Sequence, residues 1–198
     1  MLLDVSLWSA DLTRLGDEIR RMDPFADSFH FDLADGHFTP TLLFFPDLIR
    51  ALRPLTGKPF HAHLMVTHPD EWTEPLLAAG VNCIIPHLET APALRPGFGL
   101  AIAVETPLTS IEPWLDRVAL INVMATPIGI KGVDPEPVVY DKIAQLRRMT
   151  SARIMIDGGI REHTVPRFRQ AGADGIVPGS LLFGSPDPAG TASWLRSL

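Results

Sequence analysis

The stretch PFHAHLMVTHPDEWTEPLLAAGVNCIIPHL, residues 59–88, decides the expected fold. An apolar run at residues 59–66 has the length and composition of a buried strand, and a helical pattern follows at residues 69–80. Gly80 stands where a helix commonly ends, and a second apolar run follows at residues 81–88. A strand, a helix and a second strand in this order indicate a βαβ unit with parallel strands.

The same alternation continues along the rest of the chain. The eight candidate strands are LLDVSL from Leu2, SFHFDL from Ser28, PFHAHLMV from Pro59, VNCIIPHL from Val81, GLAIAVE from Gly99, RVALINVM from Arg117, ARIMIDG from Ala152 and ADGIVPGS from Ala173. Helical patterns lie between most of them, at residues 11–22, 46–53, 69–80, 110–115, 137–149 and 164–172. Eight such units indicate a closed barrel, so we expect one α/β domain over residues 1–198, a (β/α)8 TIM barrel.

One connection of the expected barrel is short. Only TAPALRPGF, residues 90–98, stands between the fourth and fifth candidate strands, and it is too short and too rich in proline for a full helix. We therefore expect the helix after strand 4 to be shortened. Asp11 is a candidate helix N-cap, and Gly172 is a candidate helix end. An open doubly wound sheet is the structural alternative.

Composition and charge exclude several classes of protein. The formal net charge is -6, which argues against the clustered basic face of a nucleic-acid-binding protein. Cys83 is the only cysteine, so no intrachain disulfide forms and a cytoplasmic location is expected. Residues 1–12 lack the basic start of a signal peptide, and no apolar run is long enough to span a bilayer, so no membrane partner is expected.

Polar residues inside the apolar strands are the first indication of chemistry. Side chains alternate between the two faces of a strand, so His30 and Asp32 share the face opposite the apolar residues of SFHFDL. By the same alternation His63 points inward from the third candidate strand, and Asp157 points inward at the carboxyl end of ARIMIDG. Active sites of TIM barrels lie at this end of the strands. We therefore expect these side chains to converge inside the barrel.

A shared cation would explain why such polar groups are buried together. A buried charge without a partner is strongly disfavoured, whereas a divalent ion can pair with several ligands at once. We expect His30, Asp32, His63 and Asp157 to hold one divalent metal ion, and this mixed ligand set suits Zn, Fe, Mn or Co. One histidine in a strand is more often a hydrogen-bonded core residue, but several inward polar residues favour the metal site.

The two carboxylates indicate a reaction type. A proton next to a carbonyl group becomes removable when a cation stabilises the resulting enediolate. If Asp32 and Asp157 lie on opposite faces of this planar intermediate, one removes the proton and the other returns a proton from the opposite side. The expected result is inversion at carbon, with Asp32 and Asp157 as the catalytic acid and base.

The last two strands are followed by candidate phosphate-binding loops. TIM barrels often bind phosphate with the loops after strands 7 and 8, where glycines let backbone N–H groups approach the anion. In this sequence the glycines and the serine of those loops are Gly158, Gly159, Gly179 and Ser180. The sequence therefore predicts a phosphorylated partner molecule, and the resemblance described next implies that it is a sugar phosphate.

These motifs resemble the ribulose-phosphate 3-epimerase family along nearly the whole chain. The matching segments are VSLWSADL, FHFDLADGHFTP, HLMVTHP, IDGGI and ADGIVPGSLLF. The resemblance implies a metal-dependent barrel of the ribulose-phosphate-binding type, an isomerase of pentose phosphate metabolism. Its implied reaction is epimerisation at carbon 3 of a ketose phosphate, D-ribulose 5-phosphate to D-xylulose 5-phosphate. The resemblance further implies a homo-oligomer, although no pattern identifies an interface.

The resemblance also assigns roles to individual residues. It implies the same four metal ligands and the same pair of aspartates as the analysis of the strands. The residues that it implies at the substrate are Ser6, Met65, Met124, Gly158, Gly159, Gly179 and Ser180.

The sequence departs from the family around the expected pocket. Ala34 replaces a usual methionine, His61 replaces a usual aspartate, and Trp8 replaces a typically aliphatic residue. Residues 126–132 differ from the usual loop after strand 6, and within them Lys131 adds a positive charge. A hexulose phosphate such as D-allulose 6-phosphate is therefore an alternative substrate.

Two other functions remain as alternatives. Related phosphate-binding barrels include decarboxylases with an Asp-x-Lys-x-x-Asp pattern, but residues 32–37 contain no lysine. A non-catalytic sugar-phosphate-binding barrel is the alternative of a different class. The sequence leaves the role of His87 open between lining the pocket and supporting the fold.

Overall fold

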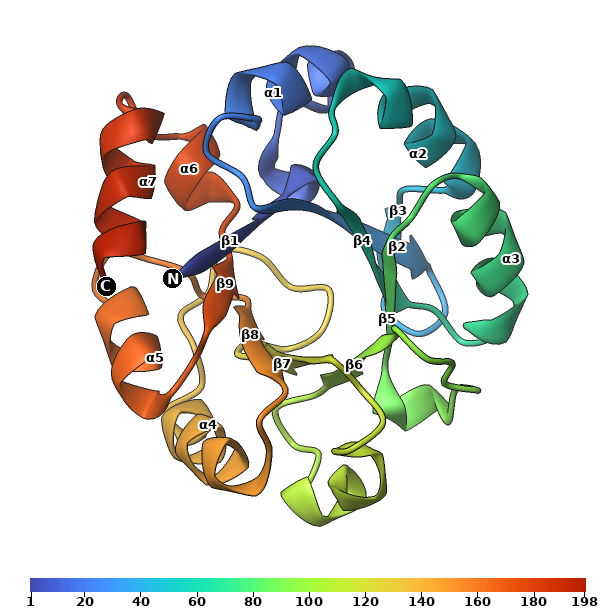
Figure 1. Ribbon diagram of the computed structural model, residues 1–198, viewed down its shortest axis with the longest axis vertical. Helices are drawn as coiled ribbons and strands as arrows, with labels where there is room; N and C mark the ends of the chain where they lie inside the picture. The colour runs from blue at the N-terminus through green and yellow to red at the C-terminus, as the bar shows by residue number, and fades with distance from the viewer.

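The computed structural model describes residues 1–198, in which eight parallel strands form a ring with helices outside it (Figure 1). The strands of the ring are β1 (Leu2–Ser6), β2 (Ser28–Asp35), β4 (Phe60–Met65), β5 (Cys83–Pro86), β6 (Gly99–Ile102), β7 (Leu120–Met124), β8 (Arg153–Asp157) and β9 (Gly175–Val177). Their order is β5-β4-β2-β1-β9-β8-β7-β6, and the short β3 (Leu42–Leu43) pairs antiparallel with the end of β2. This architecture confirms the predicted TIM barrel.

The first five helices of the outer layer fall within the predicted ranges, and the last two lie outside them. They are α1 (Leu15–Met22), α2 (Pro46–Leu52), α3 (Asp70–Ala78), α4 (Val138–Met149), α5 (Val165–Ala171), α6 (Ser180–Phe183) and α7 (Pro188–Ser197). Asp11 caps the 3-10 turn before α1 by accepting the N–H of Thr13, and Gly172 ends α5 with φ 111°. No helix of the chain is both long and apolar enough to cross a membrane.

The barrel is weakly closed between β5 and β6. One isolated parallel bridge, between His87 and Ala101, is the only strand pairing at this seam. Charged side chains complete it: Glu89 accepts the N–H of Ala103 at 2.8 Å, and the ammonium of Lys142 on α4 donates to the carbonyl oxygen of Ala103 at 2.7 Å. Side chains therefore hold the two strands together at this seam, whereas backbone hydrogen bonds join the strands in the rest of the ring.

The outer layer is also thinnest at this seam. The connection after β5 holds only the 3-10 turn Leu88–Thr90, which confirms the predicted shortened helix. The helix expected at residues 110–115 was wrong, because the connection after β6 forms two 3-10 turns, Leu108–Ser110 and Glu112–Trp114. Pro113 lies in the middle of that short segment and lacks the N–H that a helix interior needs.

Alternation along the strands separates an apolar shell from a polar centre. On β2, Phe29 and Phe31 are fully buried against the helix layer, where the Phe31 ring lies 4.6 Å from that of Phe60. His30 and Asp32 lie on the opposite face of β2, where Asp32 lines the cavity and His30 Nε2 lies 3.3 Å from Asp32 Oδ1. A small apolar cluster fills the barrel beside them, and its members are Ile85, Ala101, Leu120 and Met155. The polar groups therefore occupy the carboxyl end of a packed barrel.

Candidate active site

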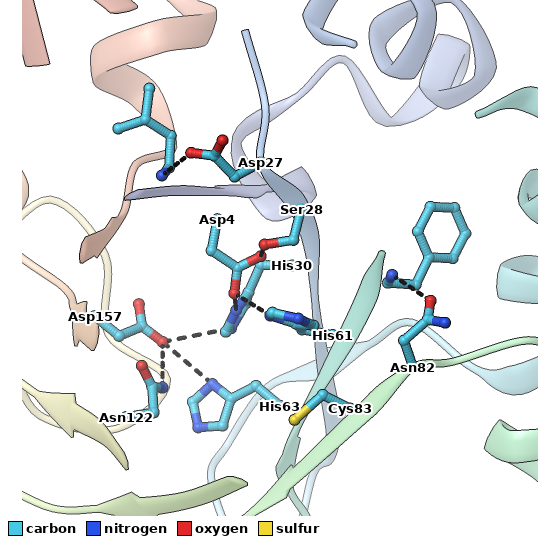
Figure 2. A network of polar contacts seen from close by, with 12 residues as sticks. Asp4, Asp27, Ser28, His30, His61, His63, Asn82, Cys83, Asn122 and Asp157 are labelled. Atoms are coloured by element: carbon cyan, nitrogen blue, oxygen red, sulfur yellow. Dashed lines mark hydrogen bonds and ion pairs between the residues drawn. The ribbon is translucent and has the colours of Figure 1, made fainter. Parts of the chain in front are cut away.

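The four predicted metal ligands converge at one point inside the barrel. Each offers one ligand atom, and these atoms of His30, Asp32, His63 and Asp157 all lie within 4.8 Å of one another. His63 Nδ1 lies 3.2 Å from both Asp32 Oδ1 and Asp157 Oδ2. His30 Nε2 lies 3.3 Å from Asp32 Oδ1 and 3.6 Å from Asp157 Oδ2. Figure 2 shows both histidine rings turned toward Asp157.

One atom of this group tests whether a metal ion fits. His30 Nε2 is buried and has no hydrogen-bond partner, although it points at the two carboxylates. An unpaired buried nitrogen is costly, and a cation between the imidazoles and carboxylates would give it a partner. Two nitrogen and two carboxylate ligands suit Zn, Fe, Mn or Co. The residues present therefore fit one divalent ion.

The charges of the group influence one another strongly. Burial alone would raise the pKa of Asp32, but the neighbouring His30 and His63 hold it well below its usual range. Burial alone would lower the pKa of His30, yet the carboxylates of Asp32 and Asp4 raise it well above its ordinary value. Since metal ligands must lose their protons, binding of an ion here has to displace protons from the histidines.

A cavity of about 350 Å³ opens onto this group at the carboxyl end of the strands. Apart from His30, which lies buried behind it, all the residues that the sequence assigned to the site line this cavity: Ser6, Asp32, His63, Met65, Met124, Asp157, Gly158, Gly159, Gly179 and Ser180. The fold thus brings the predicted catalytic, metal and phosphate residues to a single space.

Each carboxylate of the predicted acid–base pair is held by one neutral donor. The hydroxyl of Ser6 donates to Asp32 Oδ2 at 2.9 Å, and the amide of Asn122 donates to Asp157 Oδ2 at 3.2 Å. Asn122 was not predicted from the sequence. It shares the inward face of β7 with Leu120 and Met124, and a polar residue on this face of an apolar strand was the available signal.

The glycines at the far end of the cavity have conformational reasons to be glycine. Gly158 has φ 91°, and a Cβ there would lie 2.2 Å from the Thr126 hydroxyl. A Cβ on Gly179 would lie 2.4 Å from the Ser9 hydroxyl. Both positions therefore exclude larger residues, and they leave bare backbone lining the cavity, where an anion can approach N–H groups.

The loop that departs from the family, residues 126–132, also lines the cavity. It follows β7 and passes across the barrel opening in Figure 1. The Thr39 hydroxyl donates to the carbonyl oxygen of Ile128 at 3.1 Å. Lys131 donates to the carbonyl oxygen of Trp8 at 2.9 Å and lies 4.7 Å from the centre of its ring. Two of the departures from the family, Lys131 and Trp8, are thus in contact with each other at the cavity.

His87 and Glu89 form a chain of polar contacts that ends at the second ring nitrogen of His63. His63 Nε2 lies 2.9 Å from His87 Nε2, and His87 Nδ1 lies 2.9 Å from Glu89 Oε2. Burial would raise the pKa of Glu89, but hydrogen bonds from His87, the Ala103 N–H and the Thr106 hydroxyl lower it to about 2. His87 lies behind the metal ligand and outside the cavity lining, which answers the question that the sequence left open.

Comparison with known proteins identifies the family. The sequence model described as "Ribulose-phosphate 3 epimerase family" matches residues 2–183. The chain belongs to the ribulose-phosphate 3-epimerase family. This confirms the predicted family and the predicted class of enzyme, an isomerase.

Several members of the ribulose-phosphate 3-epimerase family are similar over almost their whole length. The ribulose-phosphate 3-epimerase of Synechocystis is 34% identical over 210 residues, covering 97% of this chain and 91% of that protein. The Bacillus subtilis enzyme is 31% identical and covers 96% of both chains. The "cytoplasmic isoform" of Oryza sativa is 34% identical, covering 96% of this chain and 91% of that protein.

Solved structures outside the epimerase family share the fold. Orotidine 5'-phosphate decarboxylase from Pyrococcus horikoshii superposes with a TM-score of 0.70 at 15% identity, over 100% of this chain and 98% of that one. A 3-hexulose-6-phosphate synthase superposes with a TM-score of 0.66 at 17% identity, over 100% and 99% of the two chains. At such low identity these likenesses support the barrel alone.

Proposed function

We propose that the chain inverts carbon 3 of a ketose phosphate and interconverts D-ribulose 5-phosphate and D-xylulose 5-phosphate. The observation that carries the proposal is the meeting of Asp32 and Asp157, which belong to a group of ligand atoms within 4.8 Å of one another and line the same cavity. Relatives named ribulose-phosphate 3-epimerase, 31% to 34% identical, support the same activity.

His30, Asp32, His63 and Asp157 would hold one divalent ion, which can be Zn, Fe, Mn or Co. When bound, such an ion supplies positive charge that stabilises the negative charge developing on a substrate carbonyl oxygen. His30 and His63 are neutral ligands in this arrangement, so the two carboxylates carry the negative charge of the site.

Proton transfer is the task of the two aspartates. One carboxylate removes the proton from carbon 3, and the other delivers a proton to the opposite face, so the configuration inverts. Ser6 holds Asp32 and Asn122 holds Asp157 through the hydrogen bonds of 2.9 Å and 3.2 Å described above, which fixes the orientation of each carboxylate. The reverse reaction uses the same residues with exchanged roles.

The phosphate group would bind at the far end of the cavity. Backbone N–H groups around Gly158, Gly159, Gly179 and Ser180 are the donors we assign to it. Met65 and Met124 are buried and line the wall between the two ends of the cavity, where apolar side chains exclude water from the reacting carbon.

Hydrogen exchange tests this reaction directly. The protein is incubated in heavy water with D-ribulose 5-phosphate and added Zn, Mn, Co or Fe, and NMR follows the hydrogen on carbon 3 together with the formation of D-xylulose 5-phosphate. We expect exchange and epimer formation in the same sample. Binding of the sugar phosphate without exchange at carbon 3 would instead support the non-catalytic barrel.

A hexulose phosphate is the second candidate substrate, and the contact between Lys131 and Trp8 at the cavity favours testing it. D-allulose 6-phosphate is therefore assayed beside the pentulose. A higher kcat/KM for the hexulose would change the substrate and leave the two-aspartate reaction in place. The cytoplasmic location and a homo-oligomeric state stay predictions, which fractionation and light scattering would test.

A further inference from the structure

Asp4 is a charged residue in the middle of the apolar strand β1, and only 1% of it is exposed. It lies outside the cavity lining and outside the group that would hold the ion. Figure 2 shows its carboxylate at the centre of three side chains, Ser28, His30 and His61. A buried carboxylate is costly unless it is paired, so the position of Asp4 needs an explanation.

The strand register brings the three partners of Asp4 together. Asp4 pairs with Ser28 between β1 and β2, and His30 pairs with His61 between β2 and β4. The Ser28 hydroxyl donates to Asp4 Oδ1 at 2.6 Å. Asp4 Oδ2 lies 2.9 Å from Nδ1 of His30 and 2.9 Å from Nδ1 of His61. Both oxygens of the carboxylate are therefore occupied by donors from the two neighbouring strands.

The contact with His30 determines which nitrogen of that ring carries a proton. An ionised carboxylate only accepts hydrogen bonds, so the His30 nitrogen that faces Asp4, Nδ1, must be the donor. In a neutral imidazole the other nitrogen then has a free lone pair. That nitrogen is Nε2, the buried atom without a hydrogen-bond partner that points at Asp32 and Asp157.

We propose that Asp4 is the positioning residue of the metal site: it fixes the tautomer and the ring orientation of His30 so that Nε2 is presented as a ligand. The inference rests on the proposed function, because it needs the predicted ion. A carboxylate behind a ligating histidine orients the ring and makes the nitrogen more basic, and loss of such a partner typically costs about 10–100-fold in metal affinity. Ser28 and His61 hold the carboxylate in place.

The contact with Asp4 also gives His61 a structural role. His61 stands where the sequence departs from the family, and it contacts Oδ2 of Asp4 while Ser28 contacts Oδ1. The carboxylate that orients His30 comes from β1 in this chain, and the residue at position 61 serves as a donor to it. The departure at His61 and the charge in β1 are thus parts of one arrangement.

The test compares Asp4→Asn and Asp4→Ala with the wild-type chain. Zinc affinity is measured by competition with a chromophoric chelator, and the two ring nitrogens of His30 are assigned by long-range 15N–1H NMR. For the wild-type chain we expect bound zinc and a proton on His30 Nδ1. For both variants we expect zinc affinity to fall about 10–100-fold and the His30 tautomer to become mixed or reversed.

Asp27→Asn is the matched control. Asp27 lies at the start of the same strand pair and accepts the Leu3 N–H at 2.8 Å, but it touches no predicted metal ligand. Its variant should lower the melting temperature and leave zinc affinity and the His30 tautomer unchanged. If Asp4→Asn keeps both wild-type zinc affinity and the Nδ1–H tautomer, the positioning role of Asp4 is overturned.

The NMR measurement separates this inference from the proposed function. If the wild-type chain binds no zinc, manganese or cobalt, the metal site of the proposed function fails. The tautomer of His30, read at a pH where the ring is neutral, in the wild-type chain and in Asp4→Ala then still decides whether Asp4 sets the proton position. If Asp4→Ala does not fold, circular dichroism reveals it, and Asp4→Asn, which keeps the shape of the side chain, supplies the result.

Discussion

The floor and the rim of the cavity differ in how they are built. We call Asp32 and His63, which line the cavity, together with Asp4 and His30, which lie buried behind it, the floor, and residues 126–132 the rim loop. The floor residues are at most 4% exposed and contact one another from neighbouring strands in fixed register. In the rim loop the exposed fraction reaches 44% at Ile130. Three of the floor residues, His30, Asp32 and His63, also match the family motifs, whereas the rim loop departs from them.

This difference indicates which part of the site should determine the reaction and which part should determine the choice of substrate. A substitution in the floor leaves a buried polar group without its partner, which is expensive. A substitution in the rim loop removes contacts at a partly exposed position, where hydrogen bonds to water replace some of them. We therefore expect the reaction chemistry to depend on the buried contacts between strands, and the choice of substrate to depend on the loop. The following changes test this division, beginning with the largest expected effect.

Removal of the ion should abolish the reaction. Dialysis against a chelator is expected to eliminate epimerase turnover and to lower the melting temperature, because a bound ion stabilises the folded chain by about 3 kcal/mol when present at 100 times its dissociation constant. Adding Zn, Mn, Co or Fe should restore both. Full activity in the presence of the chelator would contradict a metal-dependent floor.

Asp157→Asn should reduce kcat by about a thousand-fold, since it removes one partner of the proton transfer while keeping the shape of the side chain. Steady-state kinetics with D-ribulose 5-phosphate measures the effect, and metal analysis shows whether the ion is retained. Asp47→Asn is the control, because the Asp47 side chain is 79% exposed and lies on α2. A variant at position 157 with wild-type kcat would exclude the two-acid mechanism.

Glu89→Gln should lower the free energy of unfolding by about 1–2 kcal/mol at pH 7. The pKa of Glu89 is lowered to about 2 from the ordinary 4.5, so its carboxylate stabilises the fold above about pH 4.5 and loses this contribution as the pH falls toward 2. Urea unfolding of the variant and the wild type at pH 7, 5 and 3.5 measures the difference. The gap between the two chains should narrow as the pH falls, and a gap that is the same at all three values would refute the linkage.

Lys131→Ala should have the smallest effect, because Lys131 belongs to the rim loop. We expect KM for the sugar phosphate to rise about 3–10-fold with kcat changed less than about two-fold, in line with loss of one partly exposed charge near the phosphate end. Lys131→Arg keeps the charge and should keep KM closer to the wild-type value. An unchanged KM for Lys131→Ala would show that the rim loop makes no charged contact with substrate.

The sequence was sufficient for the barrel and for the inward direction of His30, Asp32 and His63. Alternation of apolar and polar residues in β2 separates Phe29 and Phe31 from His30 and Asp32, and this rule depends only on local geometry. The catalytic and metal roles of these residues stay predictions, although the fold brings the ligand atoms within 4.8 Å of one another. The positions of strands and of the long amphipathic helices followed from the same periodicity.

Features that depend on contacts between distant segments could not be predicted from the sequence. The contact of Asp4 with His61 requires the register of three strands, which no local pattern encodes. The helix α7 was missed because Gly190 and its small polar neighbours give a weak helical pattern, and it is stabilised instead by Asp187, which accepts the N–H of Gly190. The approach of Lys131 to Trp8 likewise joins two loops far apart in the chain.

Closure of the ring between β5 and β6 depends on two ionised side chains. Elsewhere the strands are joined by backbone hydrogen bonds, which do not depend on the ionisation of side chains. At this seam the carboxylate of Glu89 accepts the N–H of Ala103, and the ammonium of Lys142 donates to the carbonyl oxygen of Ala103. Acidification that neutralises Glu89 would therefore loosen this one edge before the rest of the wall. Because His87 forms the bridge at that edge and touches His63, we expect loosening there to disturb the position of His63 first.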